Sequence, residues 1–473
     1  MFSSSTKSKS FFLDLQPALA WTAILGLILF SALCILVHAG RLLNLAFPLG
    51  TFAVGVFLYL RYPILYLGFT WWVWFLTPWV RRLIDYQSGW TDPSPVLLSP
   101  LLVTSVSFVT LVRHLPRSYH QGGLPFILCF VGVFYGSLVG LIYNSTTTVL
   151  QQTLGWLTPI LFGFHLFVNW RDYPAYRQNI QRTFLWGVLV MGIYGVLQYL
   201  LAPEWDRFWM INSLTHRGLD SIGNPEPLGI RVFSTMNAPQ VFAAIMIAGL
   251  LLLFSNQGQL RFPAAGAGYL AFLLSSARSA WLSWLVGLLI FIPSLKAHLQ
   301  MRLIISILVA AVFVLPLTTI EPFSTAIMPR IESLSNSQDD VSYKARSEGY
   351  SRLLGLALSE FMGKGLGVSI EDSSIGAADS TILPLFLSLG WFGTIPYLSG
   401  MVLVFFKLFQ NSESHFDSFA SAARAIALGT FAQVGLNVVT AGAIGMVLWG
   451  FLGIGMAAQK YSSHQRTAGL KRD

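Results

Sequence analysis

Residues 122–143 read GGLPFILCFVGVFYGSLVGLIY, a run without a single charged side chain. An α-helix needs about 20 predominantly apolar residues to cross the hydrocarbon core of a bilayer. The apolar residues of this run are continuous, whereas the strands of an outer-membrane barrel would alternate apolar and polar residues with a period of two. The run therefore predicts a transmembrane helix.

Comparable runs recur along the whole chain and predict an all-α, polytopic transmembrane bundle that forms one membrane domain over residues 1–473. The runs 44–60 and 62–80 can also form one bent unit around Arg61, and 262–276 is short, so a count of twelve or thirteen spans is also compatible with the sequence. The fourteen candidate spans are 18–38, 44–60, 62–80, 96–112, 122–143, 152–169, 184–201, 236–254, 262–276, 279–295, 301–319, 381–407, 418–437 and 440–459.

Composition supports a membrane protein and excludes several other classes. Hydrophobic residues make up 54% of the chain and charged residues only 10%, with a mean hydropathy of +0.63. Soluble domains contain about 25% charged residues, so this chain cannot cover itself with a polar surface in water. The net charge is +9, but the positive residues are scattered and form no basic tract typical of nucleic-acid binding. Cys34 and Cys129 both lie in apolar runs, and no Cys/His spacing predicts a metal site or a cofactor.

The distribution of positive residues predicts that both termini are cytoplasmic, because cytoplasmic loops are enriched in Lys and Arg. In that orientation the segments 202–235 and 320–380 are extracytoplasmic loops. The larger loop, 320–380, contains a candidate amphipathic helix from Val341 to Met362, whose apolar face would include Tyr350, Leu354, Ala357, Leu358 and Phe361. The short outer loops hold Arg41, Arg81, Arg82 and Arg278, whereas the cytoplasmic segments hold Lys7, Lys9, Arg61, Arg113, Arg117, Arg171, Arg177, Arg182, Arg261, Lys296, Arg302, Lys407, Lys460, Arg466, Lys471 and Arg472.

Arginines at the outer ends of the spans are the candidate binding residues. The guanidinium group is a planar fork that binds phosphate oxygens through two hydrogen bonds, so several such groups can hold a diphosphate at the membrane surface. The alternative is that each arginine anchors its helix at the headgroup level or pairs with a local acid, as Asp85 allows for Arg81 and Arg82. The candidates are Arg81, Arg82, Arg231, Arg278 and Arg346.

Four sequence segments between residues 180 and 405 resemble the O-antigen ligase and O-antigen polymerase superfamily of bacterial membrane proteins. They are Arg231 to Pro239; Ser275-Ser-Ala-Arg-Ser-Ala-Trp281; Ala345-Arg346 followed by Gly363-Lys-Gly-Leu-Gly367; and Asp379-Ser380, which leads into Leu383 to Gly393. Ligases of this family typically have His where this chain has Asp379. This departure favours a polymerase over a ligase.

The resemblance implies a GT-C-like fold and a glycosyltransferase that takes its glycan from an undecaprenyl-diphosphate donor in the outer leaflet of the bacterial inner membrane. The acceptor is another glycan or a lipid, and other polysaccharide assembly proteins are expected partners. On this interpretation Arg231, Arg278 and Arg346 hold the diphosphate without a metal ion. Asp379 serves as the base, or alternatively only caps the helix that follows.

A transporter of a small anion or a sugar-linked solute is the competing interpretation, because twelve to fourteen spans suit it equally well. A transporter would place charged or helix-breaking residues near the middle of its spans. In this sequence the charges lie at the ends of the predicted spans, and Arg424 is the main exception.

The predicted topology can be tested with single cysteines placed in the loop 320–380. We expect them to react with an impermeant thiol reagent in intact cells, because this loop is predicted to face outward. Labelling that occurs only after lysis would show that the orientation is reversed.

Overall fold

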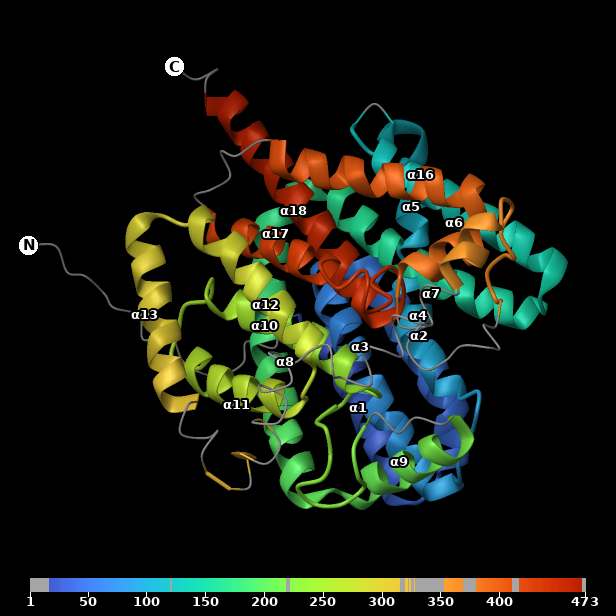
Figure 1. Ribbon diagram of the computed structural model, residues 1–473, viewed down its shortest axis with the longest axis vertical. Helices are drawn as coiled ribbons and strands as arrows, with labels where there is room; N and C mark the ends of the chain where they lie inside the picture. The colour runs from blue at the N-terminus through green and yellow to red at the C-terminus, as the bar shows by residue number, and fades with distance from the viewer. Residues whose placement is uncertain are drawn as a thin grey trace, which may run out of the picture.

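The computed structural model describes residues 17–119, 121–217, 222–314, 320–321, 323–324, 327, 353–368, 380–410 and 417–469. Within these residues the protein is α-helical, as the apolar runs predict, and its single β-type contact is an isolated bridge between Gly223 and Ile230. Figure 1 shows the helices packed into one bundle, with α9 at the end opposite the C-terminus. The predicted helix start at Val341 lies outside the described residues.

Long and short α-helices follow one another along the chain. The described part of the chain also has three short 3-10 helices, η1 (Pro95–Leu98), η2 (Trp170–Asp172) and η3 (Ile292–Ser294), which adjoin α4, α8 and α12. The α-helices are α1 (Ala18–Leu36), α2 (Gly40–Arg61), α3 (Pro63–Ser88), α4 (Ser99–Ser105), α5 (Phe108–Ser118), α6 (Leu124–Tyr143), α7 (Thr146–Val168), α8 (Tyr173–Leu201), α9 (Glu204–Arg217), α10 (Pro239–Leu253), α11 (Arg261–Leu274), α12 (Arg278–Phe291), α13 (Ala297–Val314), α16 (Ile382–Gln410), α17 (Ser418–Phe431) and α18 (Gly442–Gly469).

Seven helical segments of the described chain are long and apolar enough to cross a membrane. Two further apolar helical segments, Pro239–Leu253 and Arg278–Ser294, are shorter. The run 44–80 forms two helices rather than one bent unit, because Tyr62 leaves the helical conformation and Pro63 begins α3. The seven segments are Ala18–Leu36, Gly40–Arg61, Pro95–Ser118, Leu124–Tyr143, Trp170–Leu201, Ile382–Gln410 and Gly442–Ala468.

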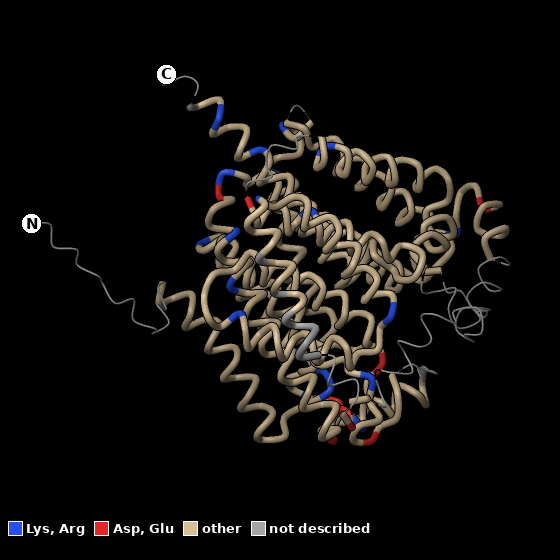
Figure 2. The backbone as a smooth tube through the Cα atoms, turned by 60° about the vertical axis from the view of Figure 1, so that its left-hand side comes forward, with Lys and Arg blue, Asp and Glu red and all other residues tan. Residues whose placement is uncertain are grey.

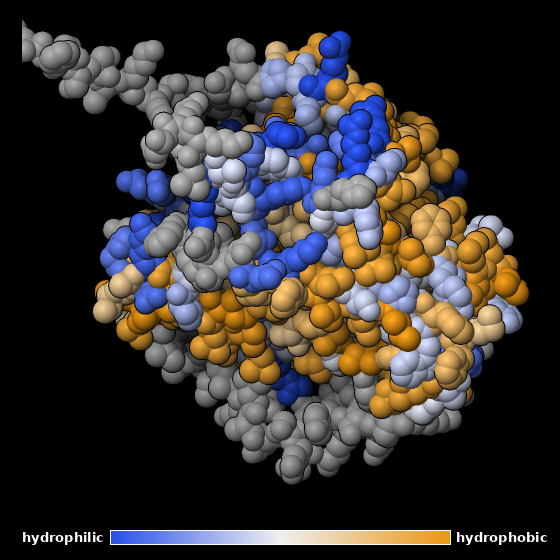
Figure 3. Space-filling model, turned by 90° about the horizontal axis from the view of Figure 1, so that it is seen from above, coloured by the Kyte–Doolittle hydropathy of each residue, from blue (hydrophilic) through white to orange (hydrophobic). Residues whose placement is uncertain are grey.

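The surface of the bundle is apolar over much of its area, as a lipid-facing surface requires. Large aliphatic side chains are exposed on α1, α2, α6 and α16, including Leu36, Leu49, Ile142 and Val402. Figure 3 shows hydrophilic residues gathered on one part of the face at the C-terminal end and apolar residues over much of the remaining visible surface. The long apolar helices and this exposed apolar surface are those of a polytopic membrane protein.

Close helix contacts in the core depend on small residues. Helix α18 is buried over residues 444–458, and it packs against α7 and α17. Gly453 of α18 lies against the backbone of Gly163 in α7, so closely that a Cβ atom there would collide with it. Gly132 of α6 meets Gly393 of α16 in the same way. Small residues at such contacts let helix backbones approach within van der Waals distance, which is the main source of helix association in lipid.

The segments between helices form two groups of contacts at opposite ends of the bundle. At one end the Lys407 and Lys460 ammonium groups donate to the carbonyls of Gly122 and Gln121, each at 3.1 Å. At the other end Asn144 donates to Lys364 O at 3.0 Å. These contacts join only segments that the predicted topology assigns to the same side. Figure 2 shows most charged residues gathered toward these two ends.

Helix α16 is interrupted at Gly390, which has φ 57° and ψ −171°. The interruption frees two backbone groups, and the segment after the loop helix binds both of them. Leu387 O accepts from Lys364 N at 2.7 Å, and Trp391 N donates to Phe361 O at 2.9 Å. Non-helical backbone at membrane depth is tolerated where the surrounding protein satisfies it in this way.

The described part of the 320–380 loop agrees only partly with the predicted amphipathic helix. Residues 353–359 are helical, and the chain turns at Gly363 and Gly365, both with positive φ. The buried face is formed by Leu353 and Ala357, which pack against Leu383 and Leu387. Leu358 and Phe361, predicted on that face, are exposed, because the segment packs on α16 from a different side.

Gly365 offers a test of this packing. Its φ of 78° is rarely adopted by other residues, and an added Cβ would collide with the backbone of Gly140 in α6. We expect Gly365→Ala to lower the thermal unfolding temperature of the purified protein clearly. Gly355→Ala is the matched control, because nothing lies within 4 Å of an added Cβ in this nearby helical turn. Equal unfolding temperatures for both variants would contradict the packing.

Candidate functional site

The loop 222–235 lies across the ends of α8 and α11, where backbone hydrogen bonds fix it. Leu228 N donates to Tyr199 O of α8 at 2.7 Å, and Val232 N donates to Leu274 O of α11 at 3.1 Å. Arg231 N donates to Ile222 O at 3.0 Å, which closes the loop on itself. The loop is therefore a fixed part of the bundle, and its side chains have defined positions.

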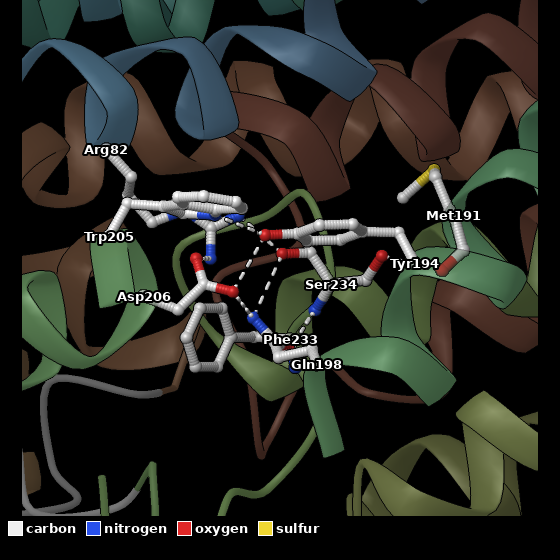
Figure 4. A network of polar contacts seen from close by, with 8 residues as sticks. All are labelled: Arg82, Met191, Tyr194, Gln198, Trp205, Asp206, Phe233 and Ser234. Carbon is white, nitrogen blue, oxygen red and sulfur yellow. Dashed lines mark hydrogen bonds and ion pairs between the residues drawn. The ribbon is translucent and has the colours of Figure 1, made fainter. Parts of the chain in front are cut away.

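Both backbone groups of Ser234 are bound by buried side chains (Figure 4). Gln198 Oε1 accepts from the N–H of Ser234 at 2.8 Å and from the N–H of Phe233 at 3.0 Å. The Arg82 guanidinium donates to the carbonyl of Ser234, and the Ser234 hydroxyl donates to Met191 O at 2.6 Å. Ser234 has φ 50°, a left-handed conformation that persists only when such contacts over-determine it.

Arg82 also forms an ion pair with Asp206 of α9, at 2.8 Å between Nη1 and Oδ1, and both side chains are fully buried. The second oxygen of Asp206 accepts from the Tyr194 hydroxyl and from Gln198 Nε2, each at 2.8 Å. The Trp205 indole N–H in turn donates to the Tyr194 hydroxyl at 2.7 Å. A buried carboxylate is stable when it is paired and hydrogen-bonded in this way. This network joins α3, α8, α9 and the loop.

Arg81 is equally buried and pairs locally. Its Nε donates to Asp85 Oδ2 at 3.0 Å, one turn along α3, and Nη2 donates to Thr91 O at 3.0 Å. The guanidinium also lies 4.8 Å from the centre of the Trp90 ring. With both guanidinium groups bound inside the protein, the geometry favours the pairing alternative for Arg81 and Arg82 over contact with a ligand.

Arg231 and Arg278 are both partly exposed, and the Arg231 side chain reaches the turn between α11 and α12 that ends at Arg278. Arg231 Nη2 donates to Ser276 O at 3.1 Å, two residues before Arg278. Ser276 has φ 53°, and the Trp281 indole N–H reaches back across the turn to Phe272 O at 3.3 Å. The structure thus brings two of the predicted binding residues to one tight turn.

Arg278 is the first residue of α12, a position where a cation is electrostatically unfavourable. The N-terminus of a helix carries a partial positive charge that favours anions by about 0.3–1 kcal/mol. The N–H groups at the start of a helix can also bind anions directly. A bound anion at this turn would be stabilised by the helix end and by the arginines together.

The other two predicted site residues, Arg346 and Asp379, lie outside the described residues. Ser380 and Thr381, which follow Asp379, are described. Ser380 Oγ accepts from Ile382 N at 3.1 Å and from Leu383 N at 3.4 Å, so Ser380 supplies a cap for α16. This is the role that the sequence left open for Asp379.

Sequence reasoning missed Asp206, Gln198 and Tyr194, which position the loop. Asp206 and Glu204 lie in the predicted outer loop 202–235, on the same side of the membrane as Arg81 and Arg82. An acid on the same side as these arginines was the sequence signal that could have indicated an ion pair. Gln198 and Tyr194 lie inside the predicted span 184–201, where a polar side chain needs a buried partner. Within the described chain, no group of three or more His, Cys, Asp or Glu residues could hold a metal ion.

No protein-family model matches this sequence, and no curated protein is significantly similar to it.

Asp206→Asn tests whether the ion pair holds this end of the bundle. The substitution leaves the Arg82 charge buried without a counter-charge, which typically costs about 3–5 kcal/mol. We expect a clear loss of thermal stability in detergent solution, and little change for Glu204→Gln, an exposed acid in the same helix turn. The double variant Arg82→Met/Asp206→Leu should recover only the part of the loss that comes from the unpaired charge, because Ser234 O, the Tyr194 hydroxyl and Gln198 Nε2 also lose a partner. Unchanged stability of Asp206→Asn would show that the network is dispensable.

Proposed function

We propose that this protein transfers a glycan from an undecaprenyl-diphosphate-linked donor in the outer leaflet of the bacterial inner membrane, as a polymerase or ligase of O-antigen or exopolysaccharide. The observation that carries the proposal is the hydrogen bond from Arg231 to Ser276 O, in the turn that leads directly into Arg278 at the N-terminus of α12. A diphosphate fits two guanidinium forks beside a helix N-terminus. The sequence resemblance supplies the nature of the donor.

The proposed chemistry is an inverting, metal-independent transfer. The acceptor hydroxyl oxygen forms a bond to the anomeric carbon of the donor sugar, and the bond from that carbon to the diphosphate oxygen breaks. The diphosphate leaves with the bonding electron pair, and Asp379 takes the hydroxyl proton. Arg231 and Arg278 contribute by placing fixed positive charge where negative charge develops on the leaving group.

The layout of the bundle suits such a donor. Its polyprenyl tail stays in lipid against the exposed apolar helices, while its diphosphate and sugars remain at the surface. We infer a GT-C-like arrangement of twelve to fourteen spans with both termini cytoplasmic, in which the 320–380 loop lies beside the glycan. The concentration of Lys and Arg in the segments assigned to the cytoplasm supports this orientation.

The competing transporter interpretation has one observation in its favour, the interruption of α16 at Gly390. Transporters use interrupted helices to expose backbone groups to a solute or an ion. In this protein Leu387 O and Trp391 N, the groups that the interruption frees, are bound by the backbone of residues 361–364. Because these groups are already paired, the interruption supports packing of the loop rather than a transport site.

Replacing either arginine of the turn tests the proposed function. We expect Arg231→Ala and Arg278→Ala to abolish glycan transfer in membrane vesicles while the protein level is unchanged. Lysine variants should retain part of the activity, because they keep the charge but lose the two-point contact. Arg207→Ala, an exposed arginine of α9, should behave like the wild type. Full activity of Arg278→Ala would refute the diphosphate role.

Asp379→Asn separates catalysis from helix capping, because Asn and Asp cap helices about equally well but Asn cannot take the proton. We expect a folded protein whose transfer rate is reduced by roughly 10²-fold or more, the usual scale for loss of a general base. If Asp379 were only a cap, Asn would be nearly fully active, and Ala would reduce the amount of folded protein.

A further inference from the structure

A pocket of about 370 Å³ lies where the start of α8 meets the start of α17 and the last part of α18. Polar and aromatic side chains line it, among them Tyr173, Arg177 and Gln178 of α8, Asp417 before α17 and Ser462 of α18. Pockets that bind small molecules or headgroups are typically about 300–1,000 Å³ in volume. The pocket lies at the opposite end of α8 from the loop 222–235, so it is separate from the proposed diphosphate site.

Asp417 fixes the charged wall of this pocket. Its Oδ1 caps α17 by accepting from Phe419 N at 3.0 Å, and its Oδ2 accepts from the Tyr173 hydroxyl at 2.6 Å. Arg177 Nη1 pairs with Asp417 Oδ1 at 3.3 Å, and 39% of the Arg177 side chain stays exposed. Within the described residues this guanidinium has no further hydrogen bond, so it retains N–H donors for the oxygens of a phosphate.

Positive charge exceeds negative charge around the pocket. The segments that form its walls, residues 170–182, 417–424 and 459–463, contain five basic residues and two acids. Basic pockets between membrane helices, at the end where Trp and Tyr gather, bind anionic lipid headgroups. Figure 3 shows hydrophilic residues gathered at this end of the bundle. The basic residues are Arg171, Arg177, Arg182, Arg424 and Lys460, and the acids are Asp172 and Asp417.

Two long helices place the pocket at the depth of lipid headgroups. A helix rises 1.5 Å per residue, so about 20 residues cross the hydrocarbon core. Counted back from Leu201, the outer end of α8, about 20 residues reach Arg182; counted forward from Gly442, the outer end of α18, they reach Tyr461. The pocket residues of both helices lie at or beyond these points. They therefore face the headgroups of the leaflet on the predicted cytoplasmic side.

An exposed row of α8 side chains connects the pocket with the lipid-facing surface. Residues four apart are neighbours on a helix, and Pro174, Gln178, Arg182, Trp186 and Val190 are all exposed. Pro174 and Gln178 line the pocket, whereas Trp186 and Val190 are apolar and lie at the depth of the hydrocarbon core. A lipid whose headgroup lies in the pocket can therefore place an acyl chain along α8.

We propose that this pocket binds the headgroup of an anionic phospholipid from the leaflet on the predicted cytoplasmic side. Arg177 donates to the phosphate, and the Gln178 amide and the Ser462 hydroxyl supply further donors. A soluble phosphorylated compound shares the phosphate but has no chain to lie against Trp186 and Val190, so the exposed row favours a lipid. The inference does not depend on glycan transfer, because its test needs no glycan donor.

Gln178→Glu tests the pocket without removing a contact, because this exposed side chain has no hydrogen bond within the described residues. The new negative charge would repel a phosphate. In a native mass spectrometry titration of the purified protein in detergent, we expect phosphatidylglycerol to bind about tenfold more weakly, the scale of one contact to a charged group. Arg113→Gln, at an exposed position of α5 at the same end, is the matched control. It changes the net charge by the same single unit and should bind like the wild type.

Arg177→Lys should also weaken the binding, because lysine can keep the pair with Asp417 but loses the two-point contact. Wild-type affinity in both Gln178→Glu and Arg177→Lys would overturn the pocket assignment. Equal weakening by Gln178→Glu and Arg113→Gln would overturn it too, since binding would then follow the general surface charge.

Two further titrations of the wild-type protein test the kind of ligand. We expect phosphatidylcholine, which has no net charge, to bind more weakly than phosphatidylglycerol, and we expect glycerol 3-phosphate to compete poorly with the lipid. Equal affinity for both lipids would refute the preference for an anionic headgroup. Competition by glycerol 3-phosphate at the same concentration as the lipid would show that the ligand is a soluble phosphate and would overturn the proposal.

Discussion

The buried ion pair between Arg82 and Asp206 is the contact on which one end of this molecule depends. Neither charge can leave its partner without becoming an unpaired charge inside the protein, so α3 and α9 are held at a fixed distance. Asp206 orients Gln198, and Gln198 together with Arg82 holds Ser234. Three residues before Ser234, Arg231 reaches the turn that starts α12. The position of the loop that carries Arg231 therefore depends on a pair of charges buried inside the protein.

The interior of the bundle and its polar end are built on different physical principles. Between α7 and α18, and between α6 and α16, glycines allow backbone contact, and dispersion forces hold the helices together. At the end near α9, charged and amide groups replace glycines as the contact residues. Such polar contacts are directional, so they fix angles and positions more narrowly than apolar packing does. Polar contacts of this kind can therefore hold the side chains of a binding site in defined positions.

The sequence predicted the parts of this structure that depend on residues close to one another in the chain. Continuous apolar runs located the helices, and the spacing of Arg81 and Asp85 allowed their local pair. It did not predict that Arg82 would pair with Asp206, because a distant partner is chosen by how α3, α8 and α9 pack. The predicted apolar face was partly wrong for the same reason. Ala357 is buried as predicted, but Leu358 and Phe361 are exposed and Leu353 is buried instead, because the contacts with α16 decide which side of the segment is covered. Arg346 and Asp379 stay predictions.

The interruption at Gly390 has a consequence for how the protein is assembled in the membrane. The groups that it frees are bound by residues 361–364, and that segment is itself bound to α6 through Leu366 N and Gly136 O, at 2.8 Å. While α16 enters the bilayer alone, an uninterrupted helix is its only low-energy state, since unpaired backbone groups in lipid cost several kcal/mol each. Glycine permits both conformations. The break therefore forms late, after α6 is in place and the preceding loop has folded back, and it marks the point at which separate inserted helices become one tertiary structure.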